Sequence, residues 1–440
     1  MNASNWDVEL ARRFHERTKH TFASVRRSGQ ELDWDNRPSP FKDYLRLEAL
    51  PLPEDDVGRL LRWGAGVIRT RRYGPDEYSF RTYSSAGALY PVEVYVAKAD
   101  GLWHFHPGEL ALRQLRDVDV RSWLGEGDTF FVLTGTLWRT AWKYGERGYR
   151  HLFWDAGTML ANLIALAAST ALEPRVETGF VDAHIDHLVG ADGEREAGVA
   201  LLALGEGKAP PLGEELPALA LAAAPLSPRE RSYPEAHAFH TASGLADGDA
   251  VSRYRADGPP MRAEPWAEGL EPVLRRRGSV RDFALEAIAL SDLVAVLGRA
   301  SSPIPVDVPP YAEVFLIVNA VEGLEAGAYR FEPPDRFELL RAGNFRREAG
   351  YLALEQPLGA RAAATIFLLV DLERVLEWHG NRGYRAVQLE GGVRVGWIYL
   401  AAFAQGLAAT ASTFYDDEVT RFFAPGTAKG TLLCAAIGRP

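Results

Sequence analysis

Cysteine is nearly absent from this sequence of 440 residues, since Cys434 is the only one. No disulfide can form within the chain, and Cys434 lies in the apolar run Leu-Leu-Cys-Ala-Ala-Ile, where cysteine behaves as a core residue. This usage fits a reducing compartment, and we expect a cytoplasmic protein.

Long hydrophobic runs are also missing. No stretch of 18 or more apolar residues occurs, so no transmembrane helix and no membrane association are expected. The first residues, Met-Asn-Ala-Ser-Asn-Trp-Asp, do not combine a basic head with an apolar core, so we expect no secretory signal.

Basic residues are outnumbered by acidic ones, with 49 Lys and Arg against 59 Asp and Glu and a net charge of −10. Nonspecific nucleic-acid binding is therefore not expected as the main task. Lysine is especially scarce, and the six lysines are Lys19, Lys42, Lys98, Lys143, Lys208 and Lys429.

Several catalytic motifs are lacking as well. The sequence contains no Gly-x-Gly-x-x-Gly, no Walker loop and no Gly-x-Ser-x-Gly elbow, which disfavours a Rossmann dinucleotide site, an NTPase and an α/β-hydrolase. His104 and His106, like His184 and His187, lack the companion ligands of a zinc site, so no metal is expected.

The length predicts two domains, and the 47% hydrophobic content indicates that both have sizeable cores. A stretch rich in Pro, Ala, Gly and Ser, with little periodicity, separates them and reads as a partly ordered linker. The expected division is a leader over 1–50, a first unit over 51–208, a linker over 209–262 and a second unit over 263–440.

Hydrophobic patterning predicts an α+β chain. We expect a helix whose N-terminal cap is Ser291. Further helices are expected over 54–69, 155–171 and 392–406, and strands over 129–136, 197–205, 311–319 and 363–370.

The two units are copies of one duplicated unit. Gly145-Glu-Arg-Gly-Tyr-Arg150 recurs as Gly380-Asn-Arg-Gly-Tyr-Arg385, and two strand segments recur in the same order. Three ordered matches favour duplication over chance. The six-residue motif itself reads best as a structural turn with an interface arginine.

Two segments carry the chemistry of binding. Ser84-Ser85-Ala86-Gly87 combines hydroxyls with a glycine that lets the backbone approach a flat ligand, although such turns also simply precede strands. Arg275-Arg-Arg-Gly-Ser-Val-Arg281 places arginines around Ser279, a pattern that can bracket a phosphate or form a solvated basic patch.

Ser-Ser-Ala-Gly-Ala-Leu-Tyr-Pro, followed by Lys143-Tyr144 and Arg277-Gly-Ser-Val-Arg281, resembles the motifs of the nitroreductase-like flavoproteins, most closely the SagB/ThcOx-type azoline dehydrogenases. The resemblance implies two nitroreductase-like units, with mixed or antiparallel sheets and helices, that form an intramolecular pseudo-dimer. It also implies FMN as cofactor.

In that family the serine-glycine loop, here Ser84, Ser85 and Gly87, binds the isoalloxazine. The resemblance gives Lys143 and Tyr144 the catalytic role. It assigns the phosphate to the arginine segment with Arg275, Arg277, Ser279 and Arg281, and places Thr413 and Phe414 near the flavin.

The two units differ in what they keep. The first has the serine-glycine loop and Lys143-Tyr144; the second has the arginine segment, with Ser302-Pro-Ile-Pro-Val-Asp-Val-Pro-Pro310 in place of the loop and Trp378-His379 in place of the pair. This predicts one competent FMN site and one decayed site per chain.

The expected function is FMN-dependent oxidation of thiazoline or oxazoline rings in a peptide or small molecule, with a cyclodehydratase as possible partner. The alternatives are an NAD(P)H-dependent nitro or quinone reductase and a flavin-free scaffold of a peptide-modifying complex.

Overall fold

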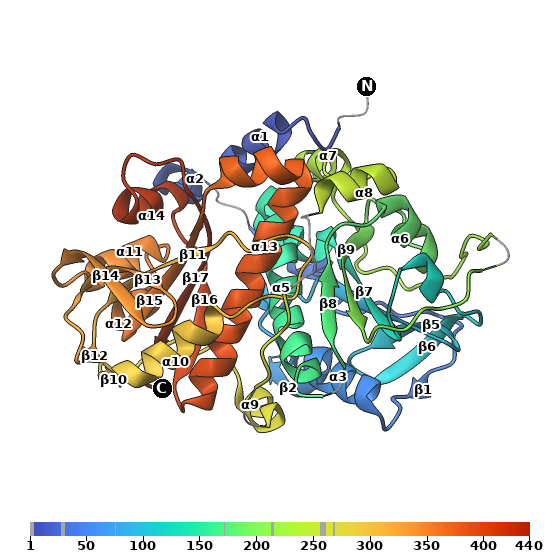
Figure 1. Cartoon of the computed structure of the whole chain (residues 1–440), viewed down its shortest axis with the longest axis horizontal. Coiled ribbons are helices and arrows are strands. Elements are labelled where there is room, and N and C mark those ends of the chain that lie inside the picture. The colour runs from blue at the N-terminus through green and yellow to red at the C-terminus, as the bar shows by residue number, and fades with distance from the viewer. Residues whose placement is uncertain are drawn as a thin grey trace.

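The molecule consists of two antiparallel sheets with helices packed between and around them (Figure 1). The computed structural model describes residues 4–27, 31–74, 76–170, 172–212, 215–255, 261–266 and 269–440. Parts of the predicted leader and linker, including 28–30 and 256–260, lie outside the described residues. The expected α+β architecture is confirmed.

The first sheet has the strand order β1-β6-β5-β4-β7-β9-β8, and all neighbours are antiparallel. Its strands are β1 (Leu50–Pro51), β4 (Val92–Lys98), β5 (Gly101–His106), β6 (Ala111–Arg116), β7 (Thr129–Thr136), β8 (Pro174–Glu177) and β9 (Glu196–Leu204). The helices of this unit are α3 (Asp56–Ala65), α4 (Leu137–Tyr144), α5 (Gly148–Ala167) and α6 (Asp182–Val189).

The second sheet has the order β14-β13-β11-β15-β17-β16, again antiparallel throughout. Its strands are β11 (Glu313–Val318), β13 (Gly327–Glu332), β14 (Arg336–Ala342), β15 (Ala364–Val370), β16 (Ala408–Ser412) and β17 (Gly430–Gly438), and the short β10 (Ile288–Ala289) pairs with β12 (Val321–Glu322). The helices are α9 (Leu270–Arg276), α10 (Leu290–Ala300), α11 (Arg346–Leu352), α12 (Pro357–Arg361), α13 (Leu372–Ala404) and α14 (Asp416–Phe423).

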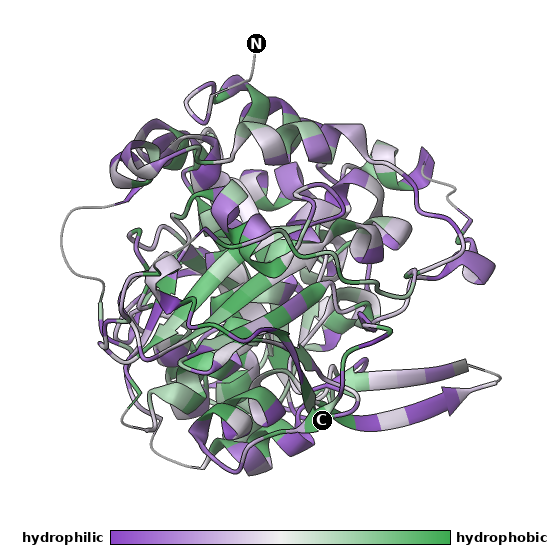
Figure 2. Cartoon of the chain, turned by 90° about the vertical axis from the view of Figure 1, so that its right-hand side faces the viewer, coloured by the Kyte–Doolittle hydropathy of each residue, from purple (hydrophilic) through white to green (hydrophobic). Residues whose placement is uncertain are grey.

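The two sheets share one topology. Matching β4 with β11, β5 with β13 and β7 with β15 brings six consecutive strands of each sheet into the same order. The repeated motifs of the sequence therefore correspond to repeated structure. Most strands of both sheets are hydrophobic and buried, whereas β1 and β14 are largely exposed. Figure 2 shows hydrophobic strands at the centre of the molecule.

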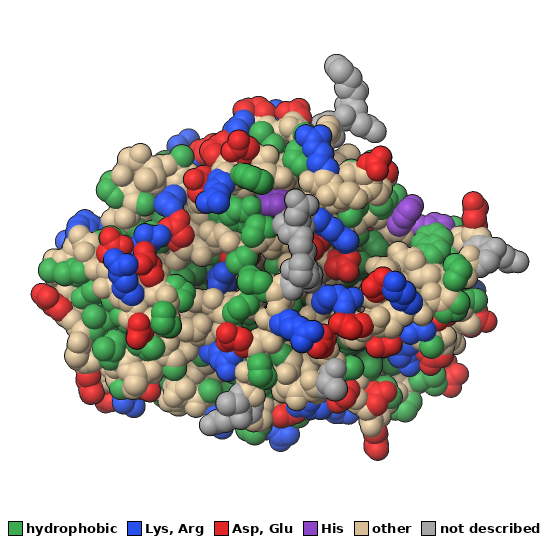
Figure 3. Space-filling model, in the orientation of Figure 1, with side chains coloured by type: hydrophobic (Ala, Val, Ile, Leu, Met, Phe, Trp, Pro, Cys, Tyr) green, Lys and Arg blue, Asp and Glu red, His purple; other side chains and the backbone are tan. Residues whose placement is uncertain are grey.

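Helices also occur outside the two sheet units, in the leader and the linker. They are α1 (Glu9–Arg17), α2 (Phe22–Arg27), α7 (Pro234–Ala242) and α8 (Gly248–Tyr254). The structure describes no helix long and apolar enough to cross a bilayer. Basic and acidic side chains are interspersed on the face seen in Figure 3.

Three sequence-based expectations need correction. The helix predicted over 54–69 ends at Ala65, because the chain leaves at Gly66 into β2 (Val67–Tyr73), which pairs with β3 (Asp76–Arg81). Ser291 is not a cap, since α10 begins at Leu290 and has no side-chain cap. The helix expected over 392–406 is the second part of the 33-residue α13.

Helices α5 and α13 cross at the centre of the molecule and join the two units (Figure 1). The contact is close because glycines meet there: a Cβ on Gly157 would lie 2.7 Å from the Cα of Gly392. Gly396 packs in the same way against the Cβ of Ala161. A side chain at either central glycine would push the helices apart.

The repeated Gly-x-Arg-Gly-Tyr-Arg motif exchanges ion pairs between the units. Arg147 and Arg150 of the first unit contact Asp416 of the second at 2.9 and 2.7 Å. In return, Arg382 and Arg385 of the second unit contact Asp182 of the first at 2.7 and 3.0 Å.

The two acceptors lie at the first residues of α6 and α14, which are equivalent elements, so the exchange is reciprocal. All four arginines are buried. The interpretation of this motif as an interface turn agrees with the geometry.

Candidate active site

A cavity of about 310 Å³ opens where the two units meet. Its walls bring together eight residues singled out in the sequence: Ser84, Ser85, Gly87, Lys143, Tyr144, Ser279, Arg281 and Thr413. The first five come from one unit and the last three from the other. Segments separated by more than 120 residues of sequence thus face one space.

The serine-glycine loop is held by one carboxylate. Ser85 Oγ donates to Asp155 Oδ2 at 2.5 Å, and the N–H of Ala86 donates to Oδ1 at 3.0 Å. Gly87, Ala88 and Tyr90 all have positive φ angles, of 65°, 54° and 48°. This conformation costs energy in residues with a Cβ, so the anchoring by Asp155 keeps the loop in a shape it would not adopt alone.

Tyr399 of α13 joins the serine loop to the arginine segment. Its hydroxyl lies 2.9 Å from Ser279 Oγ and accepts a hydrogen bond from Ser84 Oγ at 3.4 Å. It also accepts from the N–H of Ala411 at 2.6 Å. The sequence analysis did not single out Tyr399, which is fully buried in the apolar part of α13.

Three of the predicted residues do not line the cavity. Arg277 is buried and donates from Nε and Nη2 to the carbonyls of residues 81–83, so it ties the end of α9 to the start of the serine loop. Arg275 is exposed and lies over the ring of Trp63. Phe414 is completely buried behind the wall, 6.1 Å from the ring of Trp154.

Lys143 and Tyr144 end α4 directly opposite the glycine of the loop. A Cβ on Gly87 would lie 3.2 Å from the Tyr144 hydroxyl and 3.3 Å from Lys143 Nζ. Partial burial lowers the pKa of Lys143, and the positive charges of Arg281 and Arg37 add to this effect. Burial, with Asp155 nearby, raises the pKa of Tyr144. Trp138 and Trp142, on the same helix, pack with Leu89 beside the leader and the linker.

The cavity contains polar groups that the sequence analysis missed. His151 is buried, its ring stacks on Tyr144 at 3.9 Å, and its Nε2 has no hydrogen-bond partner among the described residues. Burial and the charge of Arg147 keep the pKa of His151 well below its usual value, so the ring is neutral. Thr413, which the sequence analysis did identify, also has a buried Oγ1 without a partner in the described part of the chain.

The sequence analysis missed the two residues on α5 because the pattern of apolar residues in this helix is that of a core helix. Asp155 and His151 lie in a run whose 20 residues are all buried, and nothing local marks them as pocket residues. A charged residue inside an apolar helix was the one available signal, since buried carboxylates are rare without a partner.

Asp155 is expected to make stability depend on pH. Burial raises its pKa to about 7, although the hydrogen bonds from Ser85 and Ala86 oppose the shift. The folded state then binds a proton that the unfolded state, with a pKa near 3.9, has released. The contribution of Asp155 is therefore complete below about pH 4 and is lost as pH rises through 7.

The measurement is urea unfolding between about pH 4 and 7 for the wild type and Asp155→Asn. The free energy of unfolding of the wild type should decline relative to that of the variant, by up to roughly 4 kcal/mol over this range. Parallel curves for the two proteins would contradict a buried carboxyl that titrates near neutrality. Glu126→Gln, at an exposed ion pair, serves as the control.

The equivalent place in the second unit is nearly filled. Glu390 is the equivalent of Asp155, because each lies ten residues after the first glycine of the repeated motif. Its carboxylate accepts from the N–H groups of Tyr311 and Ala312 at 2.8 and 3.0 Å. The cavity beside it measures only about 20 Å³ and is closed by Pro309, Pro310 and apolar side chains.

The linker adds to this closure. Tyr254, the last residue of α8, packs with Val308 and Ala386, and its hydroxyl lies 2.7 Å from Thr178 Oγ1. The proline-rich segment that replaces the serine loop, together with α8, thus fills the space that stays open in the other half.

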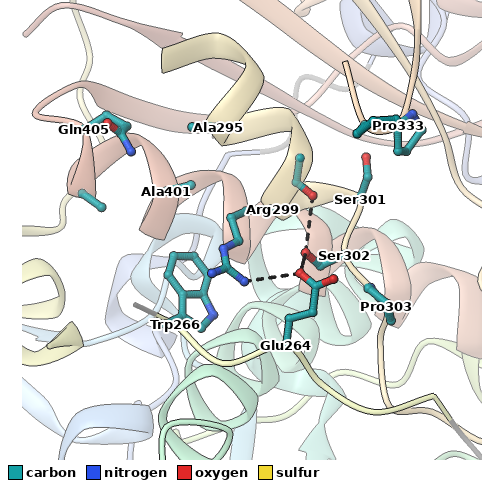
Figure 4. A pocket seen from close by; sticks show the side chains of 13 residues that line it. Glu264, Trp266, Ala295, Arg299, Ser301, Ser302, Pro303, Pro333, Ala401 and Gln405 are labelled. Carbon is teal, nitrogen blue, oxygen red and sulfur yellow. Dashed lines mark hydrogen bonds and ion pairs between the residues drawn. The ribbon is translucent and has the colours of Figure 1, made fainter. Parts of the chain in front are cut away.

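A larger cavity, of about 660 Å³, lies between α10 and the end of α13 (Figure 4). Glu264 accepts from Ser302 Oγ at 2.9 Å and contacts Arg299 at 3.5 Å, and Arg299 lies over Trp266. Ser301 Oγ, by contrast, is buried without a hydrogen-bond partner among the described residues. This cavity contains none of the predicted site residues. The smaller cavity is the better candidate site because eight of the predicted residues line it and none lines the larger one.

Comparison with known proteins identifies relatives of the chain and one structure with the same fold. No protein-family model matches the chain. A Methanocaldococcus jannaschii protein named "Putative nitroreductase" is 30% identical over 162 residues, which are 34% of this chain and 81% of that protein. The microcin B17-processing protein McbC of Escherichia coli is 28% identical over 140 residues, which are 27% of this chain and only about half, 52%, of McbC.

One solved structure matches over nearly the whole length. The crystal structure of a "putative nitroreductase" from Anabaena variabilis superposes with a TM-score of 0.82 and 26% identity, covering 98% of this chain and 99% of that one. The two units are therefore nitroreductase-like units that form a pseudo-dimer within one chain. By its sequence and its fold, the chain belongs to the nitroreductase family.

Proposed function

We propose that the chain is an FMN-dependent dehydrogenase with one flavin site, at the cavity between the two units, and that it oxidises azoline rings in peptides to azoles. The observation that carries the proposal is the convergence of the serine loop, Lys143-Tyr144 and the arginine segment on one cavity. The likeness to McbC, a protein that processes microcin B17, supports the choice of substrate.

The residues present fit FMN. Arg281 has no carboxylate partner among the described side chains, so its charge is available to an anionic ligand. The orphaned His151 Nε2 and Thr413 Oγ1 offer polar contacts, and Gly87 leaves room where any Cβ would meet Tyr144. Ser279 and Arg281 would hold the phosphate, and Ser84, Ser85 and Gly87 would face the ring system.

The chain would contribute orientation and proton transfer. Bound FMN would supply a two-electron acceptor for a hydride from the substrate ring. Lys143, whose lowered pKa favours the neutral amine, would take the ring proton at Nζ, and Tyr144 would orient it. Arg277 would keep the serine loop in register with the arginine segment.

The direct test incubates purified protein, reconstituted with FMN, with a synthetic peptide that carries one thiazoline, under air. We expect the substrate to lose two hydrogen atoms by mass spectrometry and the protein to hold one FMN per chain. Two FMN per chain would contradict the single-site proposal, because the second location measures only about 20 Å³.

A second candidate is an NAD(P)H-dependent nitroreductase, favoured by the name of the Methanocaldococcus relative. Rapid bleaching of the flavin by NADPH, without azoline oxidation, would select this candidate. A colourless protein that cannot be reconstituted would instead indicate a flavin-free scaffold.

Gly87→Val should abolish FMN binding. A Cβ at position 87 would press on Tyr144 and Lys143, and the φ of +65° adds backbone strain. Gly426→Val is the matched control, since Gly426 has a φ of +79° and a Cβ there would meet no heavy atom within 4 Å. Both variants should lose roughly 1–2 kcal/mol of stability, but only Gly87→Val should lose flavin absorbance after reconstitution. Equal flavin content in the two variants would show that the serine-glycine loop is not part of the FMN site.

A further inference from the structure

Strands β2 and β3 form a ribbon that pairs with no other strand of the described chain. It projects from the body of the molecule (Figure 2, lower right). Residues 70–74 are exposed. An isolated two-stranded ribbon is marginally stable in water, and both of its edges offer unpaired backbone groups.

One face of the ribbon combines arginine and aromatic side chains. The register pairs Arg71 with Tyr78 and Arg69 with Phe80, so these four side chains share a face. The leader adds Arg37, whose guanidinium lies 4.1 Å from the centre of the Tyr78 ring. The opposite face carries the internal pair Arg72–Glu77 instead.

The arginines of this face lack ion-pair partners among the described side chains. Arg37, Arg69 and Arg71 have no carboxylate partner among the side chains that the structure describes, and Arg69 Nε is buried without any hydrogen-bond partner there. The net charge of the chain is −10, so this cluster does not follow from overall composition. Unpaired arginines beside aromatic rings suit carboxylates presented by a flexible ligand.

The face is continuous with the mouth of the cavity. A Cβ on Gly278, next to Ser279, would lie 2.9 Å from Arg69 Nη2. Arg37 is close enough to Lys143 for its charge to lower the lysine pKa. A ligand that lies along the ribbon would therefore stay close to positively charged side chains until it reaches the cavity.

We propose that this face binds an acidic, extended polypeptide segment next to the ring that enters the cavity. We call it the ribbon face and define it by Arg37, Arg69, Arg71, Tyr78 and Phe80. The arginines would pair with carboxylates, and a free strand edge would add the segment by backbone hydrogen bonds. The inference rests on the proposed function, because it takes the segment to be the flank of the peptide substrate.

The test uses two short fluorescein-labelled peptides, one alternating glutamate with threonine and one alternating glutamine with threonine. Fluorescence anisotropy with the full chain should show binding at least about tenfold tighter for the glutamate peptide. Arg37→Gln/Arg71→Gln should lose that preference, since contacts to charged groups are each worth about tenfold or more. Arg13→Gln/Arg347→Gln, at two exposed arginines elsewhere, removes the same charge and should retain it.

Each outcome decides one question. Equal affinity for the two peptides, or equal loss in both double variants, overturns the ribbon face as the site. Tighter binding of labelled oligothymidylate than of the glutamate peptide also overturns it, in favour of nucleic acid. FMN stoichiometry, measured on the same preparations, tests the proposed function separately: flavin without peptide preference rejects only the ribbon face.

Discussion

Lys143→Ala should lower the rate of azoline oxidation by about 10²–10⁴-fold while the protein retains FMN, because a positioned general base contributes that much. Lys143 Nζ lies against Gly87 at the cavity, and its partial burial beside Arg281 and Arg37 favours the neutral form. The measurement is turnover of the thiazoline peptide together with the flavin absorbance of each preparation.

Lys98→Ala is the matched control, since Lys98 is on the far end of β4 in an ion pair with Asp100. Its turnover should equal that of the wild type. Full activity in Lys143→Ala would reject the proposed base. Loss of both activity and flavin would assign Lys143 to cofactor binding alone.

The pH profile gives a further check on the same residue. The neutral amine is present above the pKa, so turnover of the wild type should rise with pH along a limb below the ordinary lysine value of 10.5. Arg37→Gln removes one of the charges that lower this pKa and should move the limb to higher pH. A limb that stays in place would show that Lys143 is not the titrating group.

Asp416→Ala should lower the free energy of unfolding by about 3–5 kcal/mol, because it leaves Arg147 and Arg150 buried without their shared counter-charge. Asp182→Ala should have a comparable effect through Arg382 and Arg385. Urea unfolding measures both. Glu126→Ala, at the exposed pair with Lys208, should change stability by less than about 1 kcal/mol.

The acid dependence of the same pairs follows from their pKa values. Burial alone would raise the pKa of Asp182, but Arg382 and Arg385 outweigh it and lower the value to about 2. The stabilisation is therefore present above the unfolded value near 3.9 and is lost as pH falls through 2.

A loss of less than about 1 kcal/mol in the alanine variants Asp416→Ala and Asp182→Ala would mean that the ion pairs exchanged between the units contribute little to the stability.

Much of the fold could be predicted because short stretches of sequence determine it. The buried strand over 129–136 reads directly from its apolar run and agrees with β7. The repeated Gly-x-Arg-Gly-Tyr-Arg motif predicted two related units, and the prolines at 309 and 310 indicated which unit lacks the serine loop. Glycine, proline and arginine have distinct backbone or charge properties, so their patterns carry information without a structure.

The rest depends on contacts between distant residues. Asp182 and Asp416 could not be identified as partners of the motif arginines, because each lies in the other unit. The ribbon of β2 and β3 was missed because β2 has arginines on both faces, so its sequence lacks the alternation that marks a half-buried strand. Arg277 was expected at a phosphate, and only the folded chain reveals the carbonyls to which it donates.

The joining of both units in one polypeptide changes what a substitution does. In a dimer of identical chains every substitution occurs in both subunits, so a proline that fills one cavity also fills the equivalent cavity. Here Pro309 and Pro310 occur beside Glu390 alone, and the loop anchored by Asp155 is untouched. In a single chain, substitutions can therefore fill the cavity of one unit while the cavity of the other unit stays open.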